Sequence, residues 1–506
     1  MKPDGTNGAG ERHDGVMNCK RREFLKYSLL SSSCVMLGGK GIPLLVGSTS
    51  TEGWRPDSFP KLILHNLRLF DGSEDRLQNG LMVVIEGDRI SGIERDGDLS
   101  SYTDYVCVDL QGRTVLPGLI DNHVHMTVPF MYDVNINTLQ QMNDQIVLNF
   151  RNCVMNGVTT VRDVGGFPGK INKFREMANN NEIPGPSVVS SLSPIAAWDG
   201  DTLGAPPQAP YFTNPIIKWI LGGNYAERPT TIEEIEAACE KMLEYGAQWL
   251  KTLHQDQMFN YAAVPLPNHS DNGYRTILDI GKKNGIRCAL HAPFLSGFQK
   301  GVELGFHTFE HMPNDTVLPD ELIDGFIKKE MAMMPTLMIY GDYFLTDELI
   351  GMIQIDGEKY LMPEAAKQSL EALEGLAFET PEYSFKPYVI DVFPNVVANL
   401  KKMHNMGAII GAGSDIGGTR TGFFGRFTDE LKHYAAAGIS NFRILHMATS
   451  INARILDMDR EIGRVKKGML ADLIAVEGDP VEDLDALDTV DLVLKGGMVI
   501  HSKISG

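Results

Sequence analysis

The feature that most constrains this chain is the regular alternation of short apolar segments with longer helical stretches between Leu119 and Asp457. Helical patterns such as Ile232–Tyr245 separate most of the apolar segments. Such alternation favours βα units and a parallel sheet. Eight units predict an α/β protein whose central part, residues 119–457, is a closed (β/α)8 TIM barrel. The eight expected strands begin near Val115, Val158, Ser187, Gln248, Ile286, His307, Ala332 and Ala408.

The sequence on either side of this central part has a different pattern. Residues 58–118 contain short alternating strands broken by turns such as Gly87-Asp88, which predict a small antiparallel β unit. Residues 458–506 have the same character, with Gly496-Gly497 as a turn between two strands. We therefore expect the two ends to form one small β-sandwich domain beside the barrel.

Two long insertions interrupt the expected barrel. Trp198–Pro229 follows the third strand and is rich in Pro, Gly and aromatic residues, whereas Tyr340–Lys386 follows the seventh and has a partly helical pattern. Loops that follow barrel strands lie on the catalytic face of such folds. Both insertions are therefore candidate lids or walls of a substrate site.

The first 50 residues resemble a twin-arginine export signal. Arg21 and Arg22 precede Phe24-Leu25-Lys26, and a weakly apolar run follows, with small residues before position 50 as a cleavage site. The run is interrupted by serines and glycines, which makes it a poor spanning helix. We expect export by the twin-arginine machinery to the periplasm or another extracytoplasmic compartment, without stable membrane insertion. Lipoprotein processing at Cys34 and a disordered basic tail are the alternatives.

Charge and cysteine content exclude several kinds of partner and site. The net charge of -19 repels nucleic acid and anionic lipid, so neither is an expected partner. The six cysteines form no CxxC pair, which argues against a zinc ribbon or a redox pair. No pattern sets the oligomeric state, and a homo-oligomer stays open.

The strongest chemical signal is a pair of histidines, His123 and His125, directly after Pro117-Gly118-Leu119-Ile120-Asp121. Alternate residues of a strand point the same way, so both rings are expected to project into the barrel with a spacing that can chelate one cation. A lone His pair fits packing equally well. Further ligand types at the ends of later strands favour the metal.

Four more residues have the position and chemistry of ligands. Lys251 ends an apolar run, where a buried lysine is costly unless it is neutral or modified; a surface lysine is the alternative. His291 ends the next strand. His311 and His307 share the parity of the strand after it, and only the position of His311 at the carboxyl end favours it. Asp415 follows the eighth strand, where an isolated Asp usually caps a helix.

Together these residues resemble the amidohydrolase superfamily, and in particular its binuclear-metal branch of prolidase-like and imidazolonepropionase-related enzymes. The resemblance implies one divalent metal ion held by His123, His125 and Asp415. It implies a second held by His291 and His311, with carboxylated Lys251 as a bridging carbamate. Zinc is the usual occupant, although this ligand set also suits manganese or cobalt. The supporting motifs are the His-x-His segment, Gly157–Asp163, Trp249-Leu250-Lys251, Glu310-His311, Gly413-Ser414-Asp415, Ala448–Arg454 and Gly468–Leu473.

The resemblance and the charges predict hydrolysis of an amide, peptide or related C–N bond in a small molecule or short peptide. A hydroxide between the two cations would attack the carbonyl, and Asp415 would act as general base and then as general acid. Arg162, His254 and Tyr261 are candidate substrate contacts. A deaminase of the same superfamily is one alternative, although Phe294 stands where such enzymes commonly have a glutamate. A non-catalytic scaffold that kept the fold is the other.

Overall fold

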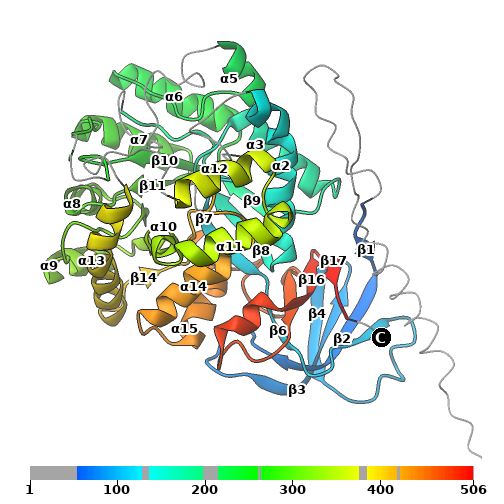
Figure 1. The fold of residues 1–506 in the computed structure, drawn as a ribbon. Helices are drawn as coiled ribbons and strands as arrows, with labels where there is room; N and C mark the ends of the chain where they lie inside the picture. Colours follow the sequence, from blue (N-terminus) through cyan, green and yellow to red (C-terminus); the bar gives the residue numbers. More distant parts are fainter. Residues whose placement is uncertain are drawn as a thin grey trace, which may run out of the picture.

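The computed structural model describes residues 54–127, 136–197, 215–259, 263, 265–374, 385–418 and 422–504. These residues form an α/β protein with parallel strands at its centre and a mixed sheet beside them (Figure 1). The expected export signal, residues 1–50, lies outside the described residues, so it stays a prediction. None of the helices in the described ranges is both long enough and apolar enough to cross a membrane.

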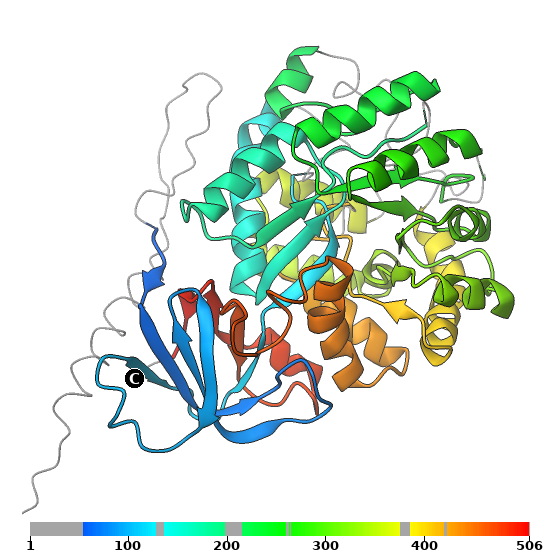
Figure 2. The ribbon, with the colours of Figure 1, turned by 180° about the vertical axis from the view of Figure 1, so that it is seen from behind.

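Strands from the two ends of the chain form one nine-stranded sheet, seen from both sides in Figures 1 and 2. Its order is β1-β17-β16-β15-β6-β2-β3-β4, with β5 paired to β2. Leu473 of β15 lies opposite Pro117 of β6, and the two strands are antiparallel. Both ends therefore meet in one β unit, and its description as a sandwich stays a prediction. The strands are β1 (Asp57–Ser58), β2 (Lys61–Leu69), β3 (Gln78–Glu86), β4 (Arg89–Arg95), β5 (Val106–Asp109), β6 (Thr114–Pro117), β15 (Leu473–Val476), β16 (Val490–Lys495) and β17 (Met498–Ser502).

The central strands are parallel and lie in two sheets, β7-β8-β9 and β10-β11-β12-β13-β14. Isolated parallel bridges join the sheets on both sides, from Ile195 to Thr252 and from Val124 to Ile416. The arrangement is that of a TIM-barrel-like fold. The strands are β7 (Leu119–Val124), β8 (Val158–Asp163), β9 (Ser187–Ser190), β10 (Trp249–Leu253), β11 (Arg287–His291), β12 (Thr308–Glu310), β13 (Ala332–Met334) and β14 (Ile409–Ile410).

Seven of the eight expected strand starts lie within one residue of the start of a central parallel strand, and the first one is wrong. Val115 belongs to β6 of the mixed sheet, and the first central strand begins at Leu119. Both strands are fully buried, so no polar residue marks the boundary between them. Gly118 is the boundary: a Cβ there would lie 2.1 Å from Thr159 Oγ1, so only glycine lets the chain cross between the sheets.

Helices lie around the outside of the parallel strands (Figures 1 and 2). Helix α7 shows why these segments are helical, because Ser270 caps its N-terminus by accepting from Gly273 N and two lysines occupy its last turn. Tyr274 and Ile277 lie on its buried face. The described α-helices are α2 (Ile136–Met155), α3 (Pro168–Asn179), α5 (Pro215–Leu221), α6 (Ile232–Glu244), α7 (Asp271–Lys283), α8 (Leu295–Leu304), α9 (Asp320–Lys328), α10 (Met338–Gly341), α11 (Thr346–Asp356), α12 (Pro363–Leu373), α13 (Phe385–Asn405), α14 (Phe427–Ala436), α15 (Asn441–His446) and α16 (Asn452–Ile455).

The insertion Tyr340–Lys386 is helical in its described part, as expected, and contains α11 and α12. Its apolar residues form a separate cluster that includes Phe423, from the segment after β14. Gln145 of α2 accepts a hydrogen bond from Met362 N at 2.6 Å, which fastens the start of α12 to the first helix after β7. The insertion thus packs beside the segments that follow β7 and β14. Most of the other insertion, residues 198–214, lies outside the described residues.

Candidate metal centre

Three of the predicted ligands converge where β7 and β14 end. The ligand atoms of His123, His125 and Asp415 all lie within 4.8 Å of one another, and all three residues are buried. Asp415 Oδ1 lies 3.3 Å from His123 Nε2 and 3.0 Å from His125 Nε2. Asp415 N also donates to His123 O at 2.7 Å, so the backbone of β7 holds the segment after β14 that carries Asp415.

Two further histidines lie beside this cluster. The rings of His291 and His311 pack at 4.4 Å between centroids, and His311 lies 4.9 Å from the ring of His123. Lys251 is 3% exposed, two residues before the end of β10, which pairs in parallel with β11. Burial lowers the pKa of the Lys251 amine to about 8, against the opposing charge of Glu310. A lysine in this state has a larger neutral fraction at physiological pH, and the neutral amine is the form that reacts with carbon dioxide.

Each of the four histidines uses one ring nitrogen for a protein oxygen. His125 Nδ1 lies 2.7 Å from Gly165 O, and His311 Nδ1 lies 2.8 Å from Thr336 Oγ1. His123 Nδ1 lies 2.6 Å from a Glu310 oxygen, and His291 Nε2 lies 2.7 Å from the amide oxygen of a neighbouring glutamine, Gln255. Partners of this kind fix the tautomer of metal-binding histidines and orient their rings.

Glu310 and Arg162 form a buried ion pair beneath this cluster, and both side chains are 0% exposed. Arg162 donates to Glu310 Oε1 at 2.7 Å, to Thr308 Oγ1 at 3.0 Å and to Asn122 O at 2.7 Å. Burial raises the pKa of the Glu310 carboxyl, but the charges of Arg162 and Lys251 outweigh it and hold that pKa well below its usual value. Glu310 is therefore an anion. The sequence analysis gave it no role, although an acidic residue inside an apolar strand was the available signal.

Arg162 was predicted to contact the substrate, and the structure places it beneath the cluster. Its guanidinium is fully buried, three of its N–H groups donate to Glu310, Thr308 and Asn122, and it lies over the Trp249 ring at 4.7 Å. Arg162 is thus the counter-ion of Glu310, and its role as a substrate contact stays a prediction.

The other predicted residues have mixed placements. His254 lies just beyond β10, with Nδ1 3.1 Å from Tyr274 Oη and Nε2 3.3 Å from an Asp256 oxygen, so it stays a candidate at the edge of the site. Tyr261 lies outside the described residues. His307 accepts a hydrogen bond from Cys288 N at the amino end of β11, which agrees with its predicted place away from the ligands.

Two of the candidate ligands have a backbone conformation that side chains rarely adopt. His311 has φ +69° and Asp415 has φ +60°, both in the left-handed region. Such strain is typical of functional sites, where surrounding contacts enforce it. Close approach is a second constraint: a Cβ on Gly413 would lie 2.7 Å from His123 Cβ, and one on Gly418 would lie 2.4 Å from Asp415 Oδ1. Glycine at both positions lets the ligands come together.

One residue of the first insertion reaches the centre and was missed by sequence reasoning. Tyr225 is 1% exposed, and its Oη lies 3.3 Å from His125 Nδ1. A Cβ on Gly165 would lie 3.0 Å from both the Tyr225 hydroxyl and the His125 ring. The insertion therefore contributes to the surroundings of the first His pair, as its position after β9 suggested.

The residues present fit a metal ion. His123 Nε2 and Asp415 Oδ1 are buried side-chain atoms without a hydrogen-bond partner. Buried polar atoms without partners are costly and rare. Imidazole nitrogens and a carboxylate oxygen are the donors that zinc, manganese and cobalt accept. A divalent cation would satisfy these orphaned atoms.

Parallel strands with a buried His/Asp cluster at their carboxyl ends define a TIM-barrel-like protein with a candidate metal centre. The chain belongs to the amidohydrolase family, whose sequence model matches residues 114–502. This match confirms the predicted resemblance, and the similar structures include prolidases. No curated protein matches the sequence.

Three solved structures illustrate the likeness. A Xaa-Pro dipeptidase with bound methionine in its active site is 23% identical, with a TM-score of 0.68, over 87% of this chain and 99% of that chain. A prolidase complexed with N-methylphosphonate-L-proline is 21% identical, with a TM-score of 0.67, over 88% of this chain and 100% of that chain. An ochratoxinase of A. niger is 16% identical, with a TM-score of 0.68, over 88% of this chain and 96% of that chain. At these identities the likeness establishes the fold.

Proposed function

We propose that this protein is a binuclear metal-dependent hydrolase that cleaves an amide, peptide or related C–N bond. In this proposal the eight parallel strands form a closed (β/α)8 barrel. His123, His125 and Asp415 would hold one metal ion, and His291 and His311 would hold a second. Lys251, carboxylated to a carbamate, would be a ligand shared by both.

The observation that carries the proposal is the arrangement of the ring nitrogens. In His123 and His125 one nitrogen faces a protein oxygen and the other faces Asp415. Histidines that only pack in a core do not have to turn one nitrogen toward a common point, whereas histidines that bind the same metal ion do. Bound divalent ions would supply Lewis acidity and lower the pKa of a nucleophilic water.

The side chains around the centre can move the protons of the reaction. Asp415 is buried, and the neighbouring His123 and His125 hold the pKa of its carboxyl well below its usual value, against the effect of burial. It is therefore ionised and can accept the proton of the attacking water. From the same position Asp415 can pass the proton to the leaving amine.

The alternative of a deaminase receives less support. Phe294, at the position where such enzymes commonly have an acidic proton shuttle, is 3% exposed and stacks on Phe259 with centroids 5.6 Å apart. No proton can be exchanged there. The similar structures named above are a dipeptidase, a prolidase and an ochratoxinase, and they favour hydrolysis of an amide-type bond in a small substrate for this chain too.

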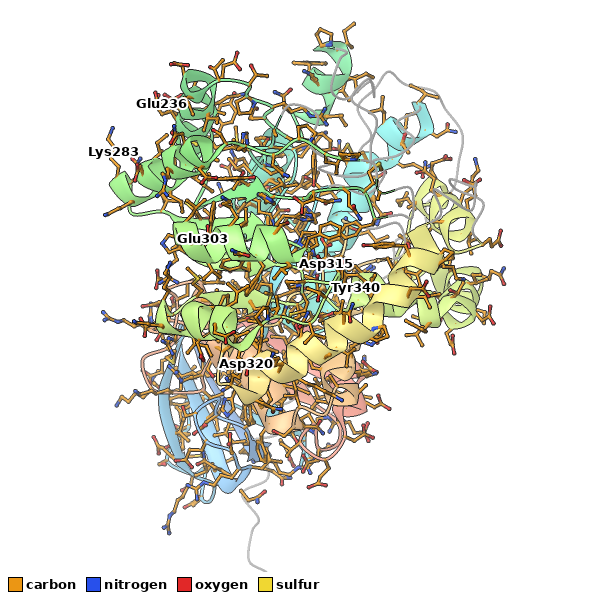
Figure 3. The ribbon with its side chains drawn as sticks, turned by 90° about the vertical axis from the view of Figure 1, so that its left-hand side faces the viewer. Glu236, Lys283, Glu303, Asp315, Asp320 and Tyr340 are labelled. Atoms are coloured by element: carbon orange, nitrogen blue, oxygen red, sulfur yellow. The ribbon has the colours of Figure 1, made fainter. Side chains whose placement is uncertain are left out.

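The test compares the metal content of the wild type with that of Lys251→Ala, on protein purified without added metal. Lys283→Ala is the matched control, because Lys283 is an exposed lysine at the end of α7 (Figure 3). Mass spectrometry should find near two transition-metal equivalents in the wild type and the control. It should find a sharp fall in Lys251→Ala, together with loss of hydrolysis across a panel of dipeptides and N-acyl amino acids.

Each contrary result has a distinct meaning. Full metal content and full activity in Lys251→Ala would refute the bridging carbamate. One equivalent in both proteins would favour a mononuclear, deaminase-like centre. A wild type without metal would favour the non-catalytic scaffold.

A further inference from the structure

Thr336 lies beside the candidate metal centre but has no side-chain chemistry that would make it a preferred ligand. It follows β13 by two residues and is 0% exposed. Its Oγ1 lies 2.8 Å from His311 Nδ1. When the imidazole binds a cation through Nε2, the Nδ1–H is free to donate to this hydroxyl oxygen. Thr336 can therefore fix both the tautomer and the ring orientation of His311.

The backbone of Thr336 is strained. Its φ is +51°, a value that a β-branched residue rarely adopts. A strained residue persists only when its surroundings enforce the conformation. On one side the main chain is held by the two residues that follow β12, because His311 N donates to Met334 O at 2.9 Å and Met312 N donates to Pro335 O at 3.2 Å.

Glu430 holds the other side. This α14 residue is 0% exposed, and each carboxyl oxygen accepts one backbone N–H: Leu337 N at 2.9 Å and Met338 N at 2.7 Å. These are the two residues directly after Thr336, at the start of α10. Two main-chain hydrogen bonds to one buried carboxyl group fix the start of this helix. Thr336 is thus fixed from both directions.

Resting on the proposed binuclear function, we propose that Thr336, held by Glu430, is a positioning residue that sets the affinity of the second metal position through His311. In the first metal position, the hydrogen-bond partner of His123 is the charged carboxylate of Glu310. In the second position, the hydrogen-bond partner of His311 is the neutral hydroxyl of Thr336. The geometry of this contact depends on a strained turn, which Glu430 holds in place from a position 93 residues after Leu337. The second position therefore depends on this turn, and the first does not.

The experiment measures both metal affinities by competition with a chromophoric chelator and records the absorption spectrum of the cobalt-loaded protein. Thr336→Val removes the hydroxyl and keeps the β-branched shape. Thr336→Ser keeps the hydroxyl and is the matched control. We expect Thr336→Val to weaken one of the two equivalents about 10- to 100-fold and to change the cobalt spectrum. Thr336→Ser should retain both affinities to within about threefold, which a merely structural role would not predict.

Glu430→Gln is the second variant, and it also serves if Thr336→Val fails to fold. The amide replaces one acceptor with a donor, so one backbone N–H is released and the same equivalent should weaken. Unchanged affinities in Thr336→Val, or equal weakening of both equivalents, would overturn the inference and leave the proposed function standing. A wild type with fewer than two equivalents would instead overturn the proposed function, and this inference with it.

Discussion

The buried ion pair beneath the site predicts a large effect for one conservative substitution, Glu310→Gln. The side chains of Glu310 and Arg162 are both 0% exposed and 2.7 Å apart. Removing one charge of such a pair leaves the other buried without compensation, which costs about 3–5 kcal/mol. The new amide would also present an N–H group to His123 Nδ1, where a donor already points. His123 would then change tautomer and lose the free Nε2 that a metal requires.

Two assays are used: urea-induced unfolding of metal-free protein, and metal content of separate samples purified without stripping their metal. Glu310→Gln should lose about 3–5 kcal/mol of unfolding free energy and its metal at the His123 position. Glu303→Gln makes the same chemical change at an exposed position on α8 (Figure 3) and should stay within about 0.5 kcal/mol of the wild type. A Glu310→Gln protein as stable as this control, with its metal retained, would refute the buried pair as a support of the site.

Two further predictions concern stability. In Gly301→Ala, the new Cβ would lie 2.4 Å from the Phe309 ring, so we expect a loss of about 1–3 kcal/mol by urea unfolding. Gly351→Ala places a methyl group where no atom lies within 4 Å, and should instead gain about 1 kcal/mol; a similar loss in both variants would contradict this explanation. Burial lowers the pKa of His501 to about 4, from an ordinary value of 6.5. The unfolded chain therefore binds a proton that the folded chain does not, and stability is lost as pH falls from 6.5 to 4. His501→Gln should reduce this loss, and an unchanged pH profile would exclude the explanation.

Sequence reasoning succeeded at the end of β7. His123 lies in this strand and His125 follows it directly, and alternation predicted that both rings lie on the same side, as they do beside Asp415. Sequence reasoning was weaker at residues whose φ is positive. His311 follows Glu310 directly, yet both reach the centre, because φ +69° at His311 breaks the alternation. Alternation along the strand therefore could not show which of its residues is the ligand. The position of His311 at the carboxyl end of the strand identified it.

Contacts between distant segments were beyond sequence reasoning. The partner of Arg162, Glu310, lies 148 residues further along the chain, and only the fold brings them together. The contact of Glu430 with the turn after Thr336 is of the same kind. Nothing in either local pattern links them. Periodicity reports which way a side chain points, whereas these pairs depend on which strands and helices become neighbours.

The pairing of β6 with β15 determines when the mixed sheet can be completed during protein synthesis. About 360 residues separate Pro117 from its partner Leu473, so a ribosome would need roughly 20–70 s to reach the second strand after the first. During that time the edge of β6 has no hydrogen-bonding partner, and open strand edges promote aggregation. Gly118, the last residue before the strand that carries His123, donates its N–H to Asp472 O beside the same pairing. The strand of the first metal ligands therefore gains its full support only when the last strands emerge.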